Sequence, residues 1–182
     1  SQPAERGVRQ AGSPAVSATS PEARQCHAQL GQSGSRFAPL PDKFYGAGCS
    51  TVNSVRIEGL GGDRGEFAVS NLGAVACPLA NSFADWARYG VDRAARQILG
   101  SPLQKIETMG SYSCRNVAGT ARRSAHSRGE AIDVAAFVLA DGRRISVLSD
   151  WNASPREREF LRVIHKSACK RFGTGLGPGY NR

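Results

Sequence analysis

Five cysteines constrain this chain more than any other feature of its sequence. They are Cys26, Cys49, Cys77, Cys114 and Cys169. None forms a Cys-x-x-Cys pair, so a zinc ribbon or a thioredoxin motif is not expected. Their wide, isolated spacing favours disulfides in an exported, periplasmic or secreted protein, whereas buried reduced cysteines in a cytosolic protein are the alternative. Because five is an odd number, at least one thiol would stay free.

Length and composition favour one domain of ordinary size, alone or with a tail. The chain has 182 residues, of which 40% are hydrophobic, enough to bury a core. It also contains 21 Gly and 9 Pro, which favours a loop-rich α+β or β-rich domain over a helical bundle. No apolar stretch approaches the roughly 18 residues of a membrane span. The N-terminal residues lack the apolar core of a signal peptide, so an exported chain would have its signal outside the printed sequence.

Local patterns predict the order of the elements. Residues 1–24 are small and polar, and we expect a disordered linker there, followed by a folded domain over residues 25–182. A loop is expected over 31–48. Strands are expected over 52–60, 103–112 and 131–139, with a hairpin return over 144–148. Helices are expected over 78–99, with Gly90 weakening the middle, and from Pro155 onward.

The positive charge is informative mainly by its distribution. Twenty-four Lys and Arg stand against 15 Asp and Glu, a net charge of +9. That balance permits binding to nucleic acid, anionic lipid or an acidic polymer. However, basic residues form no run longer than two, and aromatic residues make only 7% of the chain. We therefore expect no nucleic-acid partner, and interpret pairs such as Arg122-Arg123 and Arg143-Arg144, and Arg156 with Arg158, as solvated faces.

One short stretch combines residue types that bind metal. His126 lies in a polar loop, and Asp133 follows seven residues later between Ile132 and Val134. A carboxylate among apolar neighbours is costly to bury unless it is paired, hydrogen-bonded or bound to a metal, and imidazole and carboxylate are both zinc ligands. Gly129 would let the loop fold back toward the strand. A polar-loop histidine and an aspartate paired with an arginine are the simpler alternative.

The full motif favours the metal. Residues 124–133 match the pattern S-x-H-x-x-G-x-A-x-D, which resembles the metal signature of zinc peptidases of the bacterial cell wall, such as D-Ala-D-Ala peptidases and murein endopeptidases. The upstream word Gly110-Ser111-Tyr112-Ser113-Cys114-Arg115 resembles the segment that carries an arginine beside the substrate in those enzymes.

A second resemblance covers most of the chain, from about Cys26 to the end. The chain resembles the bacterial extensin-like protein C-terminal family in the short segments at 77–80, 110–115, 131–134, 141–143 and 176–181, and at Phe137. Together the resemblances imply a disulfide-supported α+β fold with a small, mainly antiparallel sheet and flanking helices. They also imply a zinc-dependent peptidase of the periplasm acting on peptidoglycan.

The resemblances assign roles to four residues. His126 and Asp133 would be zinc ligands. Arg115 would stabilise a developing oxyanion or hold a substrate carboxylate. Ser124 would orient the loop or touch substrate. The family completes its site with an H-x-H motif after the Gly-Pro-x-Tyr-Asn word, and the printed sequence ends at Arg182, where that motif would begin.

Other candidates have no motif support. Glu130, Asp150 and Glu157 are possible general bases on residue type alone. His165 and His27 are interpreted as structural or solvent-exposed.

Two further hypotheses follow. The cysteines would pair as Cys26–Cys49 and Cys114–Cys169, with Cys77 free and buried. The alternative to an enzyme is a non-catalytic cell-wall-binding or scaffold protein with the same fold and an incomplete site.

Overall fold

The computed structural model describes residues 20–149 and 153–172. Helix α2 (Pro21–Gln32) opens this part of the chain, and the side chain of Ser20 caps it by accepting a hydrogen bond from the backbone N–H of Ala23. The expected linker over 1–24 therefore overlaps a helix at its C-terminal end, while residues 1–19 lie outside the described residues. Ala23, Cys26 and Leu30 form the buried stripe of α2 at helical spacing.

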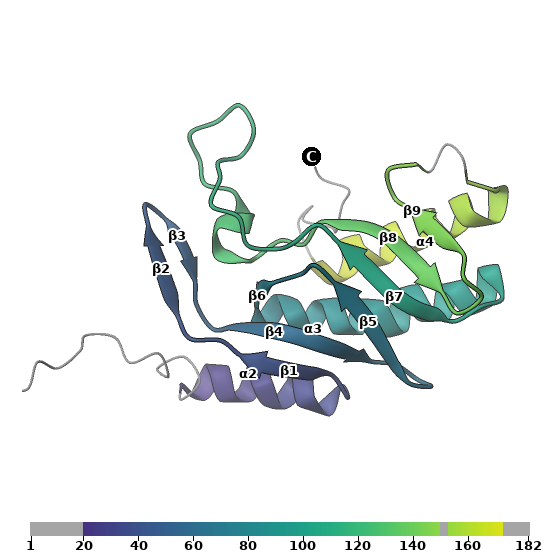
Figure 1. Ribbon diagram of the computed structural model, residues 1–182, viewed down its shortest axis with the longest axis horizontal. Coiled ribbons are helices and arrows are strands. Elements are labelled where there is room, and N and C mark those ends of the chain that lie inside the picture. The colour runs from purple at the N-terminus through teal and green to yellow at the C-terminus, as the bar shows by residue number, and fades with distance from the viewer. Residues whose placement is uncertain (1–19, 150–152, 173–182) are drawn as a thin grey trace, which may run out of the picture.

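The strands form one twisted, mixed sheet and one small hairpin (Figure 1). The large sheet contains β1 (Arg36–Pro39), β4 (Ser54–Gly61), β5 (Glu66–Ser70), β6 (Ala74–Ala76), β7 (Leu103–Thr108), β8 (Val134–Leu139) and β9 (Arg144–Ser146). Their order is β1-β4-β5-β7-β8-β9, with β6 also paired to β4. Every pairing is antiparallel except that of β5 with β7.

The hairpin consists of β2 (Lys43–Gly46) and β3 (Cys49–Thr51). It projects beyond the large sheet, on the same side as the long loop between β7 and β8 (Figure 1). Together with β1 it corrects the expectation of a loop over 31–48. Residues 31 and 32 of that segment still belong to α2, and the later glycines do not prevent strand pairing, since Gly46 and Gly48 adopt positive φ at the hairpin turn.

One long helical segment packs an apolar face into the core along its length, as the apolar pattern over 78–99 predicts. It runs through α3 (Cys77–Asp85) and two π-helical stretches, η1 (Trp86–Asp92) and η2 (Ala95–Leu99). Gly90 lies where this segment meets α4 (Pro155–Phe172), because a Cβ on Gly90 would stand 2.6 Å from Ser167 Oγ. Trp86 is fully buried and donates its indole N–H to the carbonyl of Ile164 at 3.0 Å.

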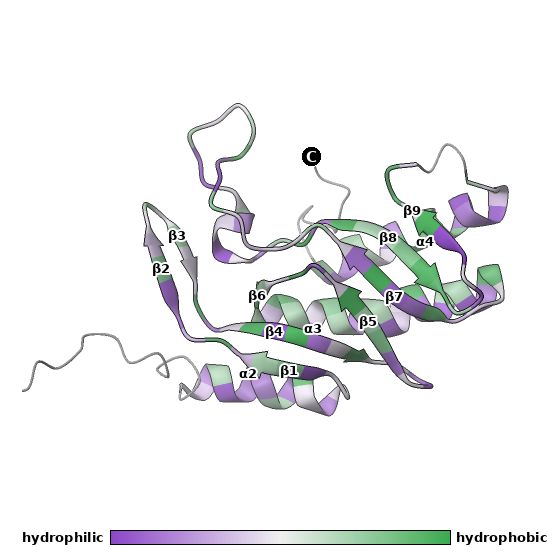
Figure 2. Cartoon of the chain, in the orientation of Figure 1, coloured by the Kyte–Doolittle hydropathy of each residue, from purple (hydrophilic) through white to green (hydrophobic). Residues whose placement is uncertain are grey.

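The helices cover one face of the sheet, and the other face is exposed. Alternation along β4 and β7 directs residues such as Val55 and Ile106 into the core, while Arg56 and Gln104 face solvent. Figure 2 shows the matching alternation of hydrophilic and hydrophobic residues around α2. The protein is thus α+β, with a mixed, mostly antiparallel sheet, as expected. Among the residues described, no helix has the length and apolar character needed to cross a bilayer.

Two disulfides support the fold, but their pairing differs from the hypothesis. Cys26 on α2 bonds to Cys77 at the start of α3, and Cys49 on the hairpin bonds to Cys114 in the β7–β8 loop. Cys169 is the free, exposed thiol. The hypothesis failed because α2 packs on α3, which brings Cys26 to Cys77, while the hairpin carries Cys49 away to the loop.

Candidate functional site

The candidate residues lie in and beside the loop that joins β7 to β8. The expected strands over 103–112 and 131–139 are shorter than predicted, because β7 ends at Thr108 and β8 begins at Val134. Asp133 therefore lies immediately before β8, where its N–H donates to Gly110 O at 3.2 Å and its carbonyl accepts from Met109 N at 2.8 Å. The ladder thus continues past the two strand ends and fixes the backbone of Asp133.

His126 is held on a single 3₁₀ turn, η3 (Ala125–Arg128). Ser124 caps this turn by accepting a hydrogen bond from His126 N at 3.3 Å, so its side chain orients the loop that carries His126. Gly129 ends the turn with φ of +66° and donates its N–H to His126 O at 3.1 Å. Its positive φ is the backbone reason for glycine at this position of the motif.

The imidazole of His126 is buried and its orientation is set by the backbone. Its Nδ1 lies 2.6 Å from the carbonyl oxygen of Ser111. A carbonyl can accept but cannot donate, so Nδ1 carries the proton in this contact. In the neutral ring, the free lone pair is then on Nε2, and Nε2 lies 3.4 Å from Asp133 Oδ1.

Arg115 lies on the other side of the Asp133 carboxylate. Its Nη2 is 3.6 Å from Asp133 Oδ2, and its side chain is half-exposed. The carbonyl of Arg115 accepts hydrogen bonds from Ser127 Oγ at 2.9 Å and Ser124 N at 2.8 Å. The structure therefore brings His126, Asp133, Arg115 and Ser124 into one cluster.

Two structural features of this cluster were not predicted from the sequence. The first is the carbonyl of Ser111, which fixes the His126 ring and lies within the word at 110–115. The second is the hairpin, which is fastened to the loop by the Cys49–Cys114 bond beside Arg115 and by a hydrogen bond from Arg123 Nε to Ala47 O at 2.8 Å. No local signal in the sequence marks the hairpin as a neighbour of the loop.

Two tyrosines extend this contact between hairpin and loop. The rings of Tyr45 and Tyr112 are 5.0 Å apart. Desolvation, followed by the neighbouring Tyr45, raises the pKa of Tyr112 above its ordinary value. A tyrosine is already protonated at neutral pH at its ordinary pKa of about 10, so the shift does not change the state of the Tyr112 hydroxyl, which remains a hydrogen-bond donor.

The remaining candidates lie elsewhere or are already paired. Glu130 is exposed and forms an ion pair with Arg128 at 3.0 Å. Glu157 on α4 accepts a hydrogen bond from the backbone N–H of Ser154, which precedes the helix, and Asp150 lies outside the described residues. The His27 ring packs against Phe37 in a tilted arrangement, with ring centroids 5.7 Å apart, and desolvation lowers the pKa of His27. His165 is on α4.

A metal site needs more ligands than this cluster contains within the described part of the chain. No group of three or more His, Cys, Asp or Glu side chains is positioned to hold a metal ion among residues 20–149 and 153–172. His126 and Asp133 nevertheless fit two positions of one site. Two ligands at the usual zinc distances in a tetrahedral site are about 3.3 Å apart, close to the 3.4 Å between Nε2 and Oδ1.

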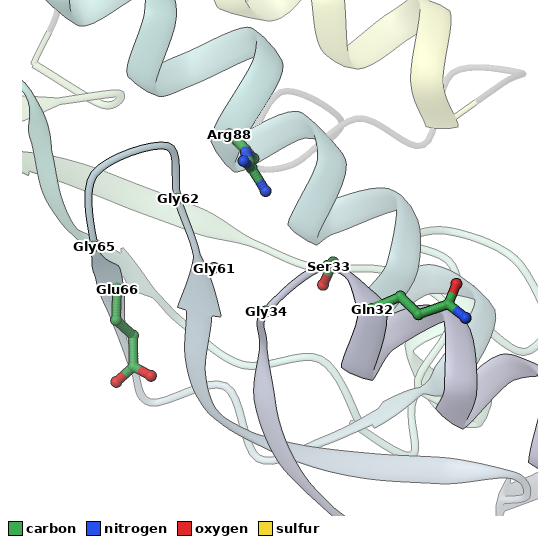
Figure 3. Close-up of a pocket in the computed structure, with 8 residues that line it drawn as sticks. All are labelled: Gln32, Ser33, Gly34, Gly61, Gly62, Gly65, Glu66 and Arg88. Atoms are coloured by element: carbon green, nitrogen blue, oxygen red, sulfur yellow. The ribbon is translucent and has the colours of Figure 1, made fainter.

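A separate hollow of about 330 Å³ lies where α2 and the β4–β5 turn meet the long helical segment (Figure 3). Glycines form much of its wall, and a Cβ on Gly61 would stand 2.1 Å from Ser33 O. Its charged side chains are already paired, Arg88 with Asp63 at 2.7 Å and Glu66 with Arg36 at 2.7 Å. This hollow is therefore a product of close backbone packing and offers no unpaired charged group to a ligand.

Comparison with known proteins gives a family. The model of the family described as "Extensin-like protein C-terminus" matches residues 24–182. The chain belongs to this family. No curated protein and no solved structure matches the chain. In this extensin-like chain the matched region includes the whole His126–Asp133 cluster and both disulfides.

Proposed function

We propose that this extensin-like protein is a zinc-dependent peptidase of the bacterial cell wall that cleaves peptidoglycan stem peptides or cross-links. One observation carries the proposal. The Ser111 carbonyl accepts a hydrogen bond from the Nδ1–H of His126, so the lone pair of the neutral ring is on Nε2, which lies 3.4 Å from Asp133 Oδ1. Two acceptors that face each other in a half-buried site repel unless a cation or a proton lies between them.

The surroundings of His126 match those of a metal-binding histidine. A ligating imidazole usually donates its second N–H to a carbonyl or carboxylate, which fixes the tautomer and the ring. Ser111 O supplies that contact, and Ser111 Oγ in turn donates to Ala131 O at 2.6 Å. Catalytic zinc sites usually have three protein ligands. The resemblance to the cell-wall peptidases implies a third ligand from an H-x-H motif, which would follow the Gly-Pro-x-Tyr-Asn segment at the end of the printed sequence.

The chain's own residues supply the remaining functions of such a site. Bound zinc would provide Lewis-acid polarisation of the scissile carbonyl and acidify water. Arg115 has an exposed guanidinium beside Asp133, so it can donate to a developing oxyanion or to a carboxylate of the stem peptide. Ser124 acts through His126, because its oxygen caps the turn that carries the ring. The two disulfides are consistent with an extracytoplasmic protein, which a periplasmic substrate requires.

The test combines metal analysis with digestion of purified peptidoglycan. Both are done on the printed sequence and on the complete reading frame that encodes it. About one zinc ion per chain is expected in the protein from the complete reading frame, and it should be lost in His126→Ala and Asp133→Asn. Release of peptide fragments should require His126 and stop on addition of a chelator. His165→Gln is the matched control, since it removes a histidine outside the cluster and should keep metal and activity.

Two outcomes would overturn the proposal. Fragment release that is unchanged in His126→Ala would exclude this cluster as the site of cleavage. Absence of zinc in both proteins, together with chelator-insensitive binding to intact peptidoglycan, would favour a non-enzymatic cell-wall-binding protein.

A further inference from the structure

The outward face of α4 carries a line of basic residues. Arg158, Arg162, Lys166 and Lys170 are all exposed and follow one another at intervals of four residues. Residues at this interval are neighbours on a helix surface. The line extends for about 18 Å at 1.5 Å per residue. We call these four residues the α4 basic stripe.

The charge of the stripe is not neutralised within the described part of the chain. None of its four residues forms an ion pair there. The acids of α4, Glu157 and Glu159, lie near its start, and from Phe160 to Phe172 the helix has no acidic residue. Residues 173–182 also contain no Asp or Glu in their sequence.

Helix stability does not account for this arrangement. Like charges four residues apart destabilise a helix. Basic residues in the last turn interact favourably with the helix dipole, which explains Lys170 and Arg171. It does not explain Arg158 and Arg162, which lie in the first half of α4.

A second group of cations adjoins the end of the stripe. The partly exposed ring of Tyr89 on η1 has three guanidinium carbons near its centroid: Arg93 at 4.6 Å, Arg88 at 5.4 Å and Arg171 at 5.9 Å. Arg171 belongs to α4. Lys170 follows Ser167 by three residues, and Ser167 is the α4 residue that faces Gly90 on η1. The stripe and the Tyr89 cluster therefore form one continuous basic face.

Acidic groups compensate this second group only in part. Asp63 accepts hydrogen bonds from Arg88, Arg93 and Arg96 at 2.7 to 3.2 Å, one carboxylate for three guanidiniums. Asp92 is buried and pairs only with Arg96 at 3.1 Å among the ion pairs of the described residues. The face keeps a net positive charge, which requires an anionic partner or solvent ions.

We propose that the α4 basic stripe and the Tyr89 cluster dock on a membrane surface rich in anionic phospholipid. Lys and Arg near such a surface are attracted to its headgroups, and a tyrosine with an apolar ring and a polar tip is suited to the same level. Val163 is 41% exposed beside the stripe and adds apolar contact. Docking leaves the candidate site open, because α4 lies behind the sheet while the β7–β8 loop projects from its edge (Figure 1).

A membrane fits this face better than nucleic acid. Single-stranded nucleic acid is bound by several aromatic side chains interleaved with basic ones, whereas the only aromatic ring counted in this face is Tyr89 and the stripe contains none. The two disulfides are also consistent with an oxidising, extracytoplasmic compartment. This inference is independent of the proposed peptidase activity, since it involves neither His126 nor Asp133.

Vesicle co-sedimentation tests the inference on the full chain. The probes are vesicles of phosphatidylcholine alone and of phosphatidylcholine mixed with phosphatidylglycerol. We expect binding to the mixed vesicles that weakens with salt, and little binding to phosphatidylcholine. Removal of three surface charges in Arg162→Gln/Lys166→Gln/Lys170→Gln should weaken binding on the order of 100-fold.

A matched variant distinguishes the effect of removing charge from this face from the effect of lowering the net charge of the protein. Arg24→Gln/Lys43→Gln/Arg122→Gln removes the same charge from three exposed residues that form no ion pair in the described part of the chain, and it should weaken binding by less than about tenfold. The single variant Lys166→Glu should also lose most binding while its far-UV circular dichroism stays unchanged.

Several results would overturn the inference. These are equal binding to both kinds of vesicle, equal losses in the two triple variants, or no binding to the mixed vesicles at low salt. Tighter binding to duplex DNA than to mixed vesicles at equal phosphate concentration would replace the membrane by nucleic acid as the partner.

Discussion

Breaking the Cys49–Cys114 bond should loosen the candidate site, whereas breaking the Cys26–Cys77 bond should not. The double variants Cys49→Ser/Cys114→Ser and Cys26→Ser/Cys77→Ser form a matched pair. The first bond joins residues 65 apart in sequence, for which chain entropy gives a stabilisation of about 4 kcal/mol. The second joins residues 51 apart, for which the same relation also gives about 4 kcal/mol. The two variants should therefore lose similar global stability.

Their local effects should differ, because the bonds connect different elements. Cys49–Cys114 fastens the β2–β3 hairpin to the loop that holds Arg115, while Cys26–Cys77 fastens α2 to α3. Within the loop, Ser113 N donates to His126 O and Ser124 N donates to Arg115 O, both at 2.8 Å. Without the hairpin bond these two amides should exchange with solvent faster.

Two measurements follow both effects. Urea unfolding should show a midpoint lower by about 2 M in each variant, for a slope of about 2 kcal/mol/M. Hydrogen exchange with mass spectrometry over residues 110–129 should accelerate in the Cys49/Cys114 variant alone. Unchanged exchange in that variant, or equal acceleration in both, would refute the argument that the hairpin restrains the site.

Four further expectations concern thiols, packing, backbone and charge. A thiol reagent should find one reactive group in the native protein, on exposed Cys169; two or more would contradict the pairing. Trp86→Ala should lower the free energy of unfolding, measured in urea, by about 3–5 kcal/mol, and Trp86→Phe should lower it by less because an aromatic ring remains. Equal losses in the two variants would show that packing of the ring is not the main contribution of Trp86 to stability. Gly129→Ala should cost about 1–2 kcal/mol for its positive φ, whereas the same change at helical Gly31, with open space around its Cβ position, should stabilise; a cost at both would refute the backbone argument. Hydrogen bonds from Arg88 and Arg93 hold the pKa of Asp63 well below its ordinary value, so its stabilisation is present at neutral pH and fades as the pH falls below about 4; thermal melts of Asp63→Asn should differ from wild type at pH 7 and converge in acid, and a gap independent of pH would contradict this.

Helical and strand patterns were predictable where burial repeats at a regular period. The apolar positions over 78–99 marked the long helical segment, because one face of it is buried along its whole length. The hairpin return after Asp141-Gly142 was predictable from its turn residues. The strands β1 and β2 were not, because they are short, largely exposed and flanked by glycine or proline.

For the candidate site, too, the residues could be predicted from the sequence but their geometry could not. The resemblance of the motif at 124–133 to a zinc-peptidase signature predicted that His126 and Asp133 lie together, and their Nε2 and Oδ1 atoms are 3.4 Å apart. The tautomer of His126 was not predictable, because it depends on the Ser111 carbonyl reached through a loop closure across fifteen residues. That closure depends on hydrogen bonds between backbone groups distant in sequence.

The sequence by itself determined the family, the α+β class and the S-x-H-x-x-G-x-A-x-D motif over residues 124–133, because each of these depends on local pattern and composition. Tertiary structure alone decided which cysteines pair and which helix face stays unneutralised. Cys26 bonds to Cys77 because α2 packs on α3, and Cys49 bonds to Cys114 because the hairpin lies against the β7–β8 loop. A disulfide forms only where the Cα atoms of two cysteines come within a narrow range of distances, and the separation of two cysteines along the chain does not predict that distance.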